Sequence, residues 1–583
     1  MRKSNRVLNK SIEARDAAKI EGFQGRQGWL FGLLLAVLVL ALWVPRGLAL
    51  DRFVTVDEPK WLARSGNFCL ALANGDLEGT FTREHPGVTV TWAGLIGFLW
   101  RYPAYAGETP GRLTESGEIA EVLKEHGKQP IEVLEAGRIV IVLAITAVLM
   151  AAFHAAVLLF GFFPALIGFL LIAFDPFLIG LSRLLHLDGL MSSLVLLSLL
   201  AFLTYLYRGR RLFDLVLSGL AAGLGWLTKS PAFILVPVVG LLSLIEFGRE
   251  VLKARRLRWM DIWPVVWPLL LWGGIGSLTF VLLWPAMWVN PLSVLQRVFT
   301  EAEIYATEGH STEIYFAGKV ITGDPGWRFY PVTYLWRSTP VVLLGLGLWL
   351  AGSLIRYRST KIKPATWPAA ALVLFALLFT VFMTFGSKKF DRYLLPIYAP
   401  LDLVAGIGWV MAAGWLGERI YLRKARLIIL FLLVTVVLGQ ALGALQTYPY
   451  YLSYYNPLMG GSAQAPQVMM IGWGEGIDQA ARYLNGKPDA ERMRVISWYP
   501  DGSFSYFFKG ETLGAAPEWE QTEPIVFGSD YVVTYIHQWQ RGLPFPEMLA
   551  YFSKQTPEQV IILNGLEYAQ IYNMHTLPGP EGK

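Results

Sequence analysis

The stretch Trp29–Leu50, WLFGLLLAVLVLALWVPRGLAL, decides the fold class of this chain. An apolar run of about 20 residues, rising 1.5 Å per residue in a helix, matches the hydrocarbon thickness of a bilayer. Two carboxylates, Asp57 and Glu58, follow a few residues beyond it. We therefore expect a membrane-spanning helix with an acidic pair just past its end, at the far surface of the membrane.

The rest of the chain has the same character. Of its 583 residues, 54% are hydrophobic and only 16% are charged, which is too apolar for one soluble core. This composition predicts an α-helical polytopic membrane protein. Together with the first run, further apolar runs predict about eleven spans, at roughly 136–160, 164–183, 188–207, 212–228, 231–247, 264–289, 336–355, 367–386, 394–416 and 427–446.

Positive charge indicates the orientation of these spans. Seven basic residues between Arg2 and Arg26 precede the first span, so the N-terminus is expected in the cytoplasm. The run is longer than a signal-peptide h-region and lacks a small-x-small cleavage site, which favours an uncleaved anchor. Later basic clusters at 208–211, 249–258, 356–363 and 419–426 all fall on the same side. The net charge of +6 therefore reflects topology and not affinity for nucleic acid.

Three regions follow from this pattern. Residues 1–28 form a cytoplasmic segment, and residues 29–446 form a transmembrane domain that includes a long outer loop, 51–135. With an odd number of spans, residues 447–583 lie outside the cytoplasm. The expected setting is a multi-pass protein of the cell (plasma) membrane.

Residues 447–583 change character along their length. They begin with a tyrosine-rich segment, 448–455, which suits the headgroup layer of a membrane. Short apolar segments then alternate with helical stretches, which predicts a small extracytoplasmic α/β domain. The expected strands lie at Val495–Tyr499, Tyr531–Tyr535 and Val560–Leu563, and the helices near Asp478–Leu484 and Phe545–Phe552.

The outer loop predicts two helices. Trp61, Phe68 and Leu72 recur at helical spacing after Asp57-Glu58-Pro59, as in an amphipathic helix that lies on a membrane. Val88–Trp100 is apolar but too short to span, so it is expected to be an interfacial or re-entrant helix that starts at His85-Pro86-Gly87. Such a loop would roof a cavity.

Asp57 has two interpretations. Its place just before Glu58 and Pro59 suits a helix N-cap, in which the carboxylate accepts backbone N–H groups. A partly desolvated carboxylate at the membrane surface can also take a proton from an acceptor hydroxyl. The two roles are compatible.

Basic residues gather on the outer side, where the positive-inside rule does not place them. A lipid-linked phosphate would account for them, because Arg and Lys stabilise phosphoryl oxygens. The alternative is snorkelling and contact with lipid headgroups. These residues are Arg138, Arg183, Lys229, Lys388, Lys389 and Arg392.

Other polar residues near this surface have a functional and a structural interpretation. Asp188, in the turn that starts at Arg183, either orients a cation or caps a helix. His310 and the segment Asp324–Pro331 are polar and aromatic enough to meet a sugar or a peptide, although loop turns would explain them too.

Several motifs are missing. Thr228-Lys229-Ser230 lacks the glycine of a phosphate-binding P-loop, and Gly472-Trp-Gly-Glu-Gly476 has its third glycine out of register for a dinucleotide site. A single cysteine, Cys69, excludes an internal disulfide and a cysteine-cluster metal site. We predict no cofactor and no metal ligands, and the sequence does not decide whether a divalent ion assists.

The motifs together resemble the protein O-mannosyltransferases (glycosyltransferase family 39-like) and their relative, the aminoarabinose transferase of lipid A, in the GT-C class of membrane glycosyltransferases. The resemblance covers roughly residues 29–446. It rests on Val56-Asp57-Glu58, His85-Pro86, Leu187-Asp188-Gly189, Leu227-Thr-Lys-Ser-Pro231 and Ser387-Lys-Lys-Phe-Asp-Arg-Tyr-Leu-Leu-Pro396.

This resemblance implies a hexose, such as mannose, carried on a polyprenyl or dolichyl monophosphate and attacked by an acceptor hydroxyl on the outer face, with inversion at the anomeric carbon. Asp57 would be the general base, and Glu58 would support it or bind the sugar. Arg138, Lys229, Lys388, Lys389 and Arg392 would hold the departing phosphate, and His85, Arg183, Asp188, His310 and Tyr393 complete the predicted substrate site. The acceptor would be a protein, a lipid or a glycan of the cell envelope.

The chain departs from the family pattern in two places. Asp391 lies inside the basic loop, and residues 447–583 do not have the pattern of the β-trefoil domain found in eukaryotic protein mannosyltransferases. The alternative function is a transporter or flippase of a lipid-phosphate-linked sugar with an outer binding domain. Transporters often show duplicated halves, and this sequence shows no such internal symmetry.

Overall fold

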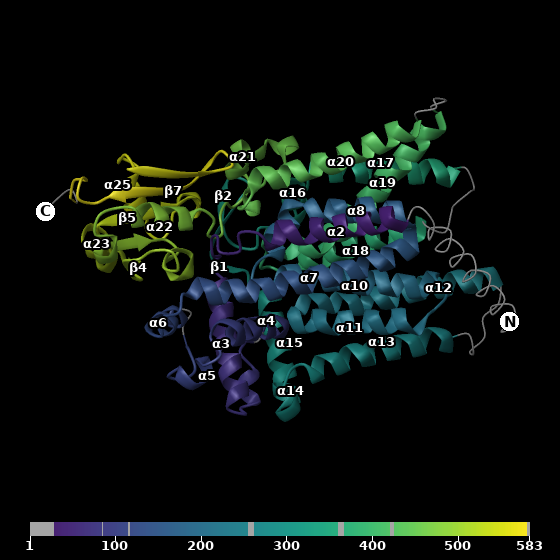
Figure 1. Cartoon of the computed structure of the whole chain (residues 1–583), viewed down its shortest axis with the longest axis horizontal. Helices are drawn as coiled ribbons and strands as arrows, with labels where there is room; N and C mark the ends of the chain where they lie inside the picture. Colours follow the sequence, from purple (N-terminus) through teal and green to yellow (C-terminus); the bar gives the residue numbers. More distant parts are fainter. Residues whose placement is uncertain are drawn as a thin grey trace.

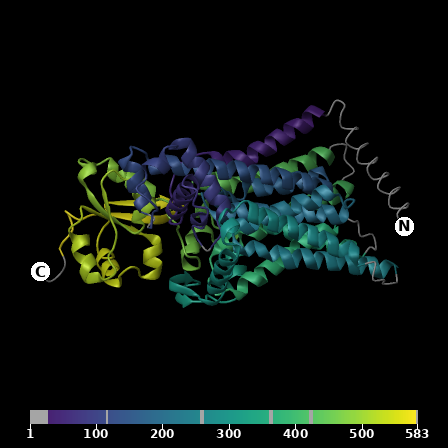
Figure 2. The same cartoon turned by 90° about the horizontal axis from the view of Figure 1, so that it is seen from below.

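The chain folds into a bundle of long helices with a small mixed α/β domain beyond one end. The computed structural model describes residues 28–83, 85–114, 117–254, 262–358, 366–419 and 425–579. The bundle helices follow the long axis of the molecule (Figure 1), and the C-terminal domain lies past their ends in a perpendicular view as well (Figure 2). This architecture confirms the predicted fold class, a polytopic helical membrane protein with a C-terminal α/β domain.

Within the described residues, eight helices are long and apolar enough to cross a bilayer, or up to ten if two bent pairs each make one crossing. The eight are α2 (Gly28–Gly47), α7 (Pro130–Phe160), α10 (Leu187–Tyr207), α12 (Leu235–Ala254), α13 (Trp263–Leu282), α18 (Thr366–Phe385), α19 (Tyr398–Arg419) and α20 (Ala425–Thr447). The bent pairs are α8 (Phe162–Phe174) with α9 (Pro176–Ser182), and α16 (Phe329–Arg337) with α17 (Pro340–Arg358).

The predicted number of about eleven spans exceeds the upper count of ten within the described residues by one. The difference is α11 (Leu212–Thr228), an apolar helix of 17 residues. At 1.5 Å per residue this helix is slightly shorter than the hydrocarbon layer.

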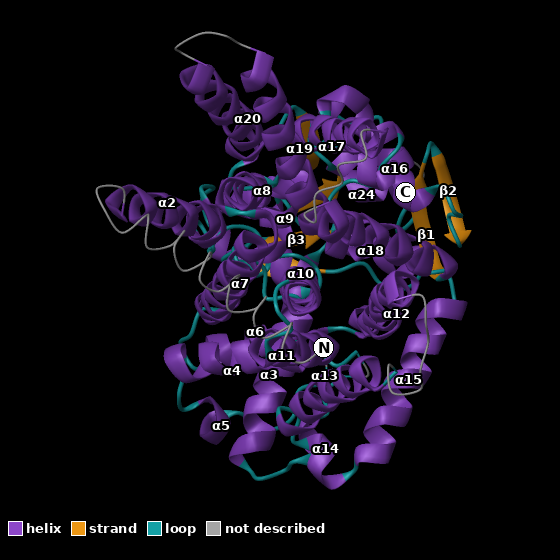
Figure 3. Ribbon diagram, turned by 90° about the vertical axis from the view of Figure 1, so that its right-hand side faces the viewer, coloured by secondary structure: helices purple, strands orange, loops and turns teal. Residues whose placement is uncertain are grey.

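Helix α10 forms the centre of the bundle. In an end-on view it is surrounded by other helices, whereas α2 stands at the periphery (Figure 3). The apolar window of α10 is 94% buried, against 17% for α2. Asp188 lies in the first turn of α10 and is therefore buried inside the protein.

The basic clusters and the predicted site lie at opposite ends of the same helices. Helix α10 begins beside Asp188 and ends before Arg208, and α12 begins after Lys229 and ends near Lys253. Arg210 and Glu250 form an ion pair of 2.7 Å between these distal ends. The seven basic residues before the first span lie outside the described residues, as do Arg255, Arg256, Arg258, Lys361, Lys363, Arg423 and Lys424 of the later clusters.

The outer loop folds into α3 (Glu58–Ala73), α4 (Val88–Arg101), α5 (Tyr105–Glu108) and α6 (Glu118–Glu125). Helix α3 runs across the bundle axis (Figure 1), and its Trp61 and Phe68 side chains are buried. The helix predicted after Asp57 is confirmed, but its apolar face packs inside the protein and not on a membrane surface. Helix α4 packs closely on α7, where a Cβ at Gly97 would lie 2.8 Å from the backbone nitrogen of Gly137.

Between α13 and α16 the chain forms two further helices and a β-hairpin. These are α14 (Ala286–Val289), α15 (Pro291–Thr307), β1 (His310–Phe316) and β2 (Lys319–Gly323). The strands β1 and β2 pair in antiparallel fashion. Lys389 fixes this hairpin to the loop before α19, because its Nζ lies 2.5 Å from Asp324 and its backbone N and O both lie within 3.0 Å of the His310 ring.

The C-terminal domain contains a five-stranded sheet in the order β4-β3-β5-β7-β6. Strands β4, β3 and β5 are parallel, and β7 is antiparallel to β5 and β6. The predicted strands and helices are all present, and the complete set is α21 (Gly461–Gln464), α22 (Ile477–Asn485), β3 (Arg494–Ser497), β4 (Glu511–Leu513), α23 (Trp519–Phe527), β5 (Tyr531–Tyr535), α24 (Ile536–Arg541), α25 (Pro546–Phe552), β6 (Gln559–Leu563) and β7 (Leu566–Asn573).

Alternation along the strands gives the sheet two buried faces. Ile496, Val532 and Tyr572 are register partners on one face and pack with residues of α23 and α25. Val533 and its partner Ile571 belong to the other core, which is continuous with the helical bundle. The domain is therefore fused to the membrane part through one face of its sheet.

Close backbone contacts join this domain to the segment that leads to Asp57. The Ser503 hydroxyl donates to the Val54 carbonyl at 2.7 Å. Gly474 has φ +113°, and a Cβ there would lie 2.4 Å from the same carbonyl oxygen. The glycine-rich segment 472–476 thus serves close packing against the outer loop.

The tyrosine segment does not form the predicted headgroup belt. Tyr450, Tyr451, Tyr454 and Tyr455 are buried, and among the five tyrosines only Tyr448 is exposed. The hydroxyl of Tyr450 donates to Asp478 of α22 at 2.9 Å, so these rings join the bundle to the C-terminal domain.

We expect Gly474→Ala to destabilise the protein by about 1–3 kcal/mol through left-handed strain, with further loss from the clash with Val54. Thermal unfolding followed by tryptophan fluorescence in lipid nanodiscs measures this. Gly565→Ala is the matched control, because Gly565 also has positive φ but nothing lies within 4 Å of its Cβ position. Equal losses in the two variants would contradict the close-packing role of Gly474.

Candidate active site

Asp57 occupies the position before α3 that suits an N-cap, but its side chain does not cap the helix. Its Oδ2 accepts a hydrogen bond from Arg392 Nη2 at 3.3 Å and lies 3.7 Å from His186 Nε2, while Oδ1 lies 3.4 Å from Lys60 Nζ. About a quarter of the side chain is exposed. The carboxylate therefore faces a cavity, which favours the second of its two predicted roles.

Burial raises the pKa of the Asp57 carboxyl, but the hydrogen bond from His186 and the charge of Arg392 outweigh this effect, and the net pKa is lowered. Burial lowers the pKa of His186, whereas Asp188 and Asp57 raise it, with a net rise. Asp57 is thus held as a carboxylate beside the His186 ring and the Arg392 guanidinium.

Glu58 points the other way, into the protein. Its carboxylate makes a bidentate ion pair with Arg138, with Nε–Oε1 and Nη2–Oε2 distances of 2.7 and 2.5 Å. It also accepts the backbone N–H groups of Thr55 and Leu185. Glu58 is fully buried. The structure therefore does not bring Glu58 into contact with a sugar, and the supporting role is the one that its position allows.

Arg138 and Arg183 donate to backbone carbonyls and do not line the cavities at Asp57. Arg138 donates to the carbonyls of Leu50, Arg52 and Phe53 in addition to Glu58. Arg183 donates to the carbonyls of Leu48, Ala49 and Pro449. Both guanidinium groups are buried, so the predicted phosphate contact of Arg138 and the predicted substrate contact of Arg183 are not supported.

Asp188 joins three cations behind Asp57. Its Oδ1 lies 2.7 Å from Lys229 Nζ, and its Oδ2 lies 3.3 Å from His186 Nδ1 and 3.6 Å from Arg392 Nε. Asp188 is fully buried at the start of α10, where it also neutralises the positive end of the helix. Of its two predicted roles, the orientation of cations is the one observed.

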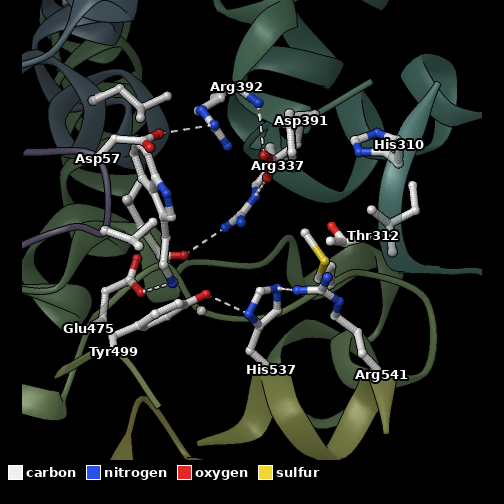
Figure 4. Close-up of a pocket in the computed structure, with 18 of the residues that line it drawn as sticks. Asp57, His310, Thr312, Arg337, Asp391, Arg392, Glu475, Tyr499, His537 and Arg541 are labelled. Carbon is white, nitrogen blue, oxygen red and sulfur yellow. Dashed lines mark hydrogen bonds and ion pairs between the residues drawn. The ribbon is translucent and has the colours of Figure 1, made fainter. Parts of the chain in front are cut away.

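Two adjoining cavities of about 330 and 320 Å³ meet at Asp57. Their shared wall contains Asp57, Lys60, His310, Thr312, Phe390 and Arg392. We call the first the domain-side cavity, because Trp473, Glu475, Tyr499, His537 and Arg541 of the C-terminal region line it (Figure 4). The second is the basic cavity, and within the described chain Asp57 is its only acidic lining residue.

The basic cavity takes its name from six side chains that line it: Lys60, Arg64, Arg83, Lys229, Lys388 and Arg392. His85 and Tyr393 also line it, and the Lys229 ammonium lies 4.0 Å from the centre of the Tyr393 ring. Burial lowers the pKa of His85 to about 3, with help from the charges of Lys229 and Arg83, so this ring is neutral.

His310 lies on the wall between the cavities, as predicted for a substrate-binding residue. Burial lowers the pKa of its ring to about 4, against the opposing effect of the Lys389 backbone. Lys389 itself is buried on Asp324 and lines neither cavity, so its predicted contact with phosphate is not supported.

Several cavity residues are absent from the sequence prediction. Lys60 and Arg64 follow Asp57 at helical spacing, and Arg83 precedes His85, which are signals that sequence reasoning had available. His186 stands between two predicted residues, Arg183 and Asp188. Trp473, Tyr499, His537 and Arg541 reach the site only through the docking of the C-terminal domain, for which the sequence has no local signal.

A family model described as dolichyl-phosphate-mannose-protein mannosyltransferase matches residues 132–282. Over these residues the chain resembles the protein mannosyltransferases. The match contains Arg138, Arg183, Asp188 and Lys229 and confirms the resemblance inferred from the motifs for this part of the chain. No curated protein sequence matches the chain.

Solved structures resemble the chain only distantly. ArnT from Cupriavidus metallidurans in the apo state is 14% identical over 95% of this chain and 99% of its own, with a TM-score of 0.48. The same protein bound to undecaprenyl phosphate gives 13% identity, coverage of 96% and 100%, and a TM-score of 0.46. The archaeal oligosaccharyltransferase AglB from Archaeoglobus fulgidus, in complex with an inhibitory peptide and a dolichol-phosphate, gives 11% identity, coverage of 89% and 70%, and a TM-score of 0.45.

We expect Glu58→Gln to destabilise the protein by about 3–5 kcal/mol, because it leaves the buried Arg138 charge without its partner. Thermal unfolding in nanodiscs checks this, with Asp57→Asn as the neighbouring control. A smaller change is expected there, because about a quarter of the Asp57 side chain is exposed and Arg392 keeps its contact with Asp188. A Glu58→Gln protein as stable as wild type would contradict the structural role of the pair.

We expect stability to fall as the pH drops below about 6.5, in part through His537. Burial and the nearby charge of Arg541 lower the pKa of His537 to about 3 in the folded protein, against an ordinary value of 6.5. At pH 5 the His537 side chain therefore binds a proton in the unfolded chain but not in the folded chain. This difference lowers the free energy of unfolding by about 2 kcal/mol at pH 5. His537→Gln should reduce the difference in unfolding temperature between pH 7 and pH 5.

The control for this pH effect is His575→Gln, since the His575 side chain is largely exposed. This variant makes the same change of side chain at an exposed site, and we expect a smaller effect on the pH dependence of unfolding than that of His537→Gln. If His537→Gln also left it unchanged, the neutral state of His537 would be contradicted.

Proposed function

We propose that this protein is an integral-membrane glycosyltransferase that moves a sugar from a polyprenyl or dolichyl monophosphate to an acceptor hydroxyl. The observation that carries the proposal is the position of Asp57, an ionised carboxylate on the wall between a strongly basic cavity and a second cavity. The resemblance of residues 132–282 to protein mannosyltransferases supports the same reaction and makes mannose the first sugar to test.

The basic cavity suits the phosphate of the donor. Lys229, Lys388 and Arg392 line it with Lys60, Arg64 and Arg83, and within the described residues no carboxylate lies within 4 Å of Lys388. Preorganised cations of this kind stabilise the charge that develops on a departing phosphate. Tyr393, His85 and His310 complete the walls and offer neutral surfaces to the sugar.

In the proposed reaction the acceptor oxygen forms a bond to the anomeric carbon while the bond from that carbon to the phosphate oxygen breaks. Asp57 takes the proton of the hydroxyl, and the cations of the basic cavity take the phosphate monoester that leaves. Attack from the side opposite the phosphate gives inversion. A carboxylate aimed into the junction of the cavities is positioned for the proton transfer.

Arg392 couples the two halves of this reaction. Its guanidinium contacts Asp57, lines both cavities and lies 4.3 Å from the ring centres of both Phe390 and Trp473. A donor phosphate would compete with Asp57 for this cation. Loss of the Arg392 contact would raise the pKa of Asp57 and make it a stronger base once the donor is bound.

The proposed orientation places the site and the C-terminal domain on the extracytoplasmic face of the cell membrane. The described basic residues near the distal ends of α10, α12 and α19 support it, because such charges favour the cytoplasmic side. The partners in this proposal are a lipid-linked sugar donor, membrane lipids and a protein, lipid or glycan acceptor.

We expect Asp57→Asn to lower sugar transfer by about 10²–10⁴-fold, because the amide cannot accept the proton. Purified protein in nanodiscs is given radiolabelled polyprenyl-phosphate sugars and native membrane extract, and label leaving the carrier is counted. Arg494→Gln, which alters an exposed ion pair of the C-terminal domain, is the control.

Full transfer by a folded Asp57→Asn protein would contradict the assignment of the base. Movement of the lipid across vesicles without a covalent product would instead favour the transporter.

A further inference from the structure

The domain-side cavity lies across Asp57 from the basic cavity. Its lining comes from the outer loop, from β1, from α9, α16 and the loop 390–392 of the bundle, and from the C-terminal region. Phe177, Leu181 and Leu452 supply apolar surface, while Trp473, Tyr499 and Arg541 supply polar groups. The argument about its occupant rests on the proposed function, because it uses the basic cavity as the place of the donor phosphate.

Inversion separates the two substrates in space. The acceptor oxygen and the leaving phosphate lie on opposite sides of the anomeric carbon at the transition state. With the phosphate in the basic cavity and the base on the shared wall, the acceptor must approach from the domain-side cavity.

Arg541 differs from Arg337 and Arg392 of this cavity because it has no carboxylate partner among the described residues. Its Nη1 donates to His537 Nε2 at 3.2 Å, and its Nε is buried with no hydrogen-bond partner. Within the described residues no carboxylate lies within 4 Å of it, and Glu313 acts on it only over a longer range. Burial lowers the pKa of Arg541, as expected for a cation that lacks a close counter-ion.

The partner of Arg541 is neutral. His537 Nε2 can accept the Arg541 N–H only if it carries no proton, in agreement with the lowered pKa of the ring, about 3. On its other side, His537 Nδ1 lies 2.5 Å from the Tyr499 hydroxyl. The row Tyr499, His537 and Arg541 thus positions the guanidinium without neutralising it (Figure 4).

The other two arginines of the cavity are already paired with carboxylates, and Glu475 is held by hydrogen bonds. Arg337 contacts Asp391 at 2.8 Å, and Arg392 contacts Asp57. Glu475 accepts the backbone N–H of Trp473 at 2.5 Å, and burial raises its pKa. Figure 4 shows Arg541 at the end of the cavity away from Asp57 and Arg392. An anion beside Arg541 would complete the charge balance there.

We propose that the domain-side cavity receives the acceptor, and that Arg541 binds an anionic group, a carboxylate or a phosphate, carried by the acceptor near its reacting hydroxyl. The hydroxyl meets Asp57 at one end of the cavity, and the anionic group meets the guanidinium at the other. The C-terminal domain thereby selects the acceptor.

The first test uses the acceptor itself. Native membrane extract is fractionated on an anion exchanger, and each fraction is assayed with wild type and Arg541→Gln. Acceptor activity should be retained by the resin, and Arg541→Gln should raise its KM at least tenfold with kcat nearly unchanged. Phosphatase treatment or methyl esterification of the fraction then distinguishes a phosphate from a carboxylate. The matched control is Arg494→Gln, an exposed arginine of the same domain.

The second test does not need turnover. Binding of radiolabelled pyrophosphate to the purified protein in nanodiscs should show two sites, of which Arg541→Gln removes one and Lys388→Gln the other. A neutral acceptor, an unchanged KM in Arg541→Gln, or two sites retained by Arg541→Gln would each overturn the proposal. If only the proposed function were wrong, the result would be different. No sugar would be transferred from any donor, but Arg541→Gln would still remove one pyrophosphate-binding site.

Discussion

The buried ion pair between Glu58 and Arg138 is the constraint on which the rest of the site depends. Arg138 belongs to α7, and through its five N–H groups it holds Glu58 together with the carbonyls of the segment that links α2 to α3. The start of α3 is thereby fixed, and Asp57, one residue earlier, has no freedom except in its side chain. A pair this deeply buried adds little net stability, but loss of either partner is costly. The role of this pair is to fix the position of the start of α3 and therefore of Asp57.

Around this anchor, charge is distributed so that each carboxylate has a different task. Glu58 forms the buried ion pair with Arg138. Asp188 lies close to three cationic or basic groups, those of Lys229, His186 and Arg392. Of these three carboxylates, only Asp57 faces the junction of the two cavities. The cations follow the same logic. Arg138 and Arg183 hold backbone carbonyls, whereas Lys229, Lys388 and Arg392 face the basic cavity. The adjacent residues Lys388 and Lys389 differ in the same way. Lys388 lines the basic cavity, whereas Lys389 is buried on Asp324.

Much of the fold could be predicted from the sequence, because membrane spans and strands each have a characteristic local pattern of hydrophobic residues. The positions of Asp57, Lys229, Lys388, Arg392, His85 and Tyr393 at the cavities agree with the motifs, and His310, predicted as a polar loop residue, lines both cavities. What failed was the separation of structural from cavity-facing charges, as in Arg138 and Lys389. The interpretation of α3 and of Tyr450–Tyr455 as membrane-surface elements failed for the same reason, since an apolar face does not reveal whether lipid or protein covers it.

The sequence by itself determined that this is a polytopic membrane protein, that an acidic pair follows its first span, and that a small α/β domain ends the chain, because these properties depend on composition and on periods of two and 3.6 residues. Only the tertiary structure decided that Asp57 and not Glu58 faces the cavities, and that Trp473, His537 and Arg541 share a cavity with it. Those facts depend on contacts between segments hundreds of residues apart, such as Ser503 with Val54, and no local pattern encodes them.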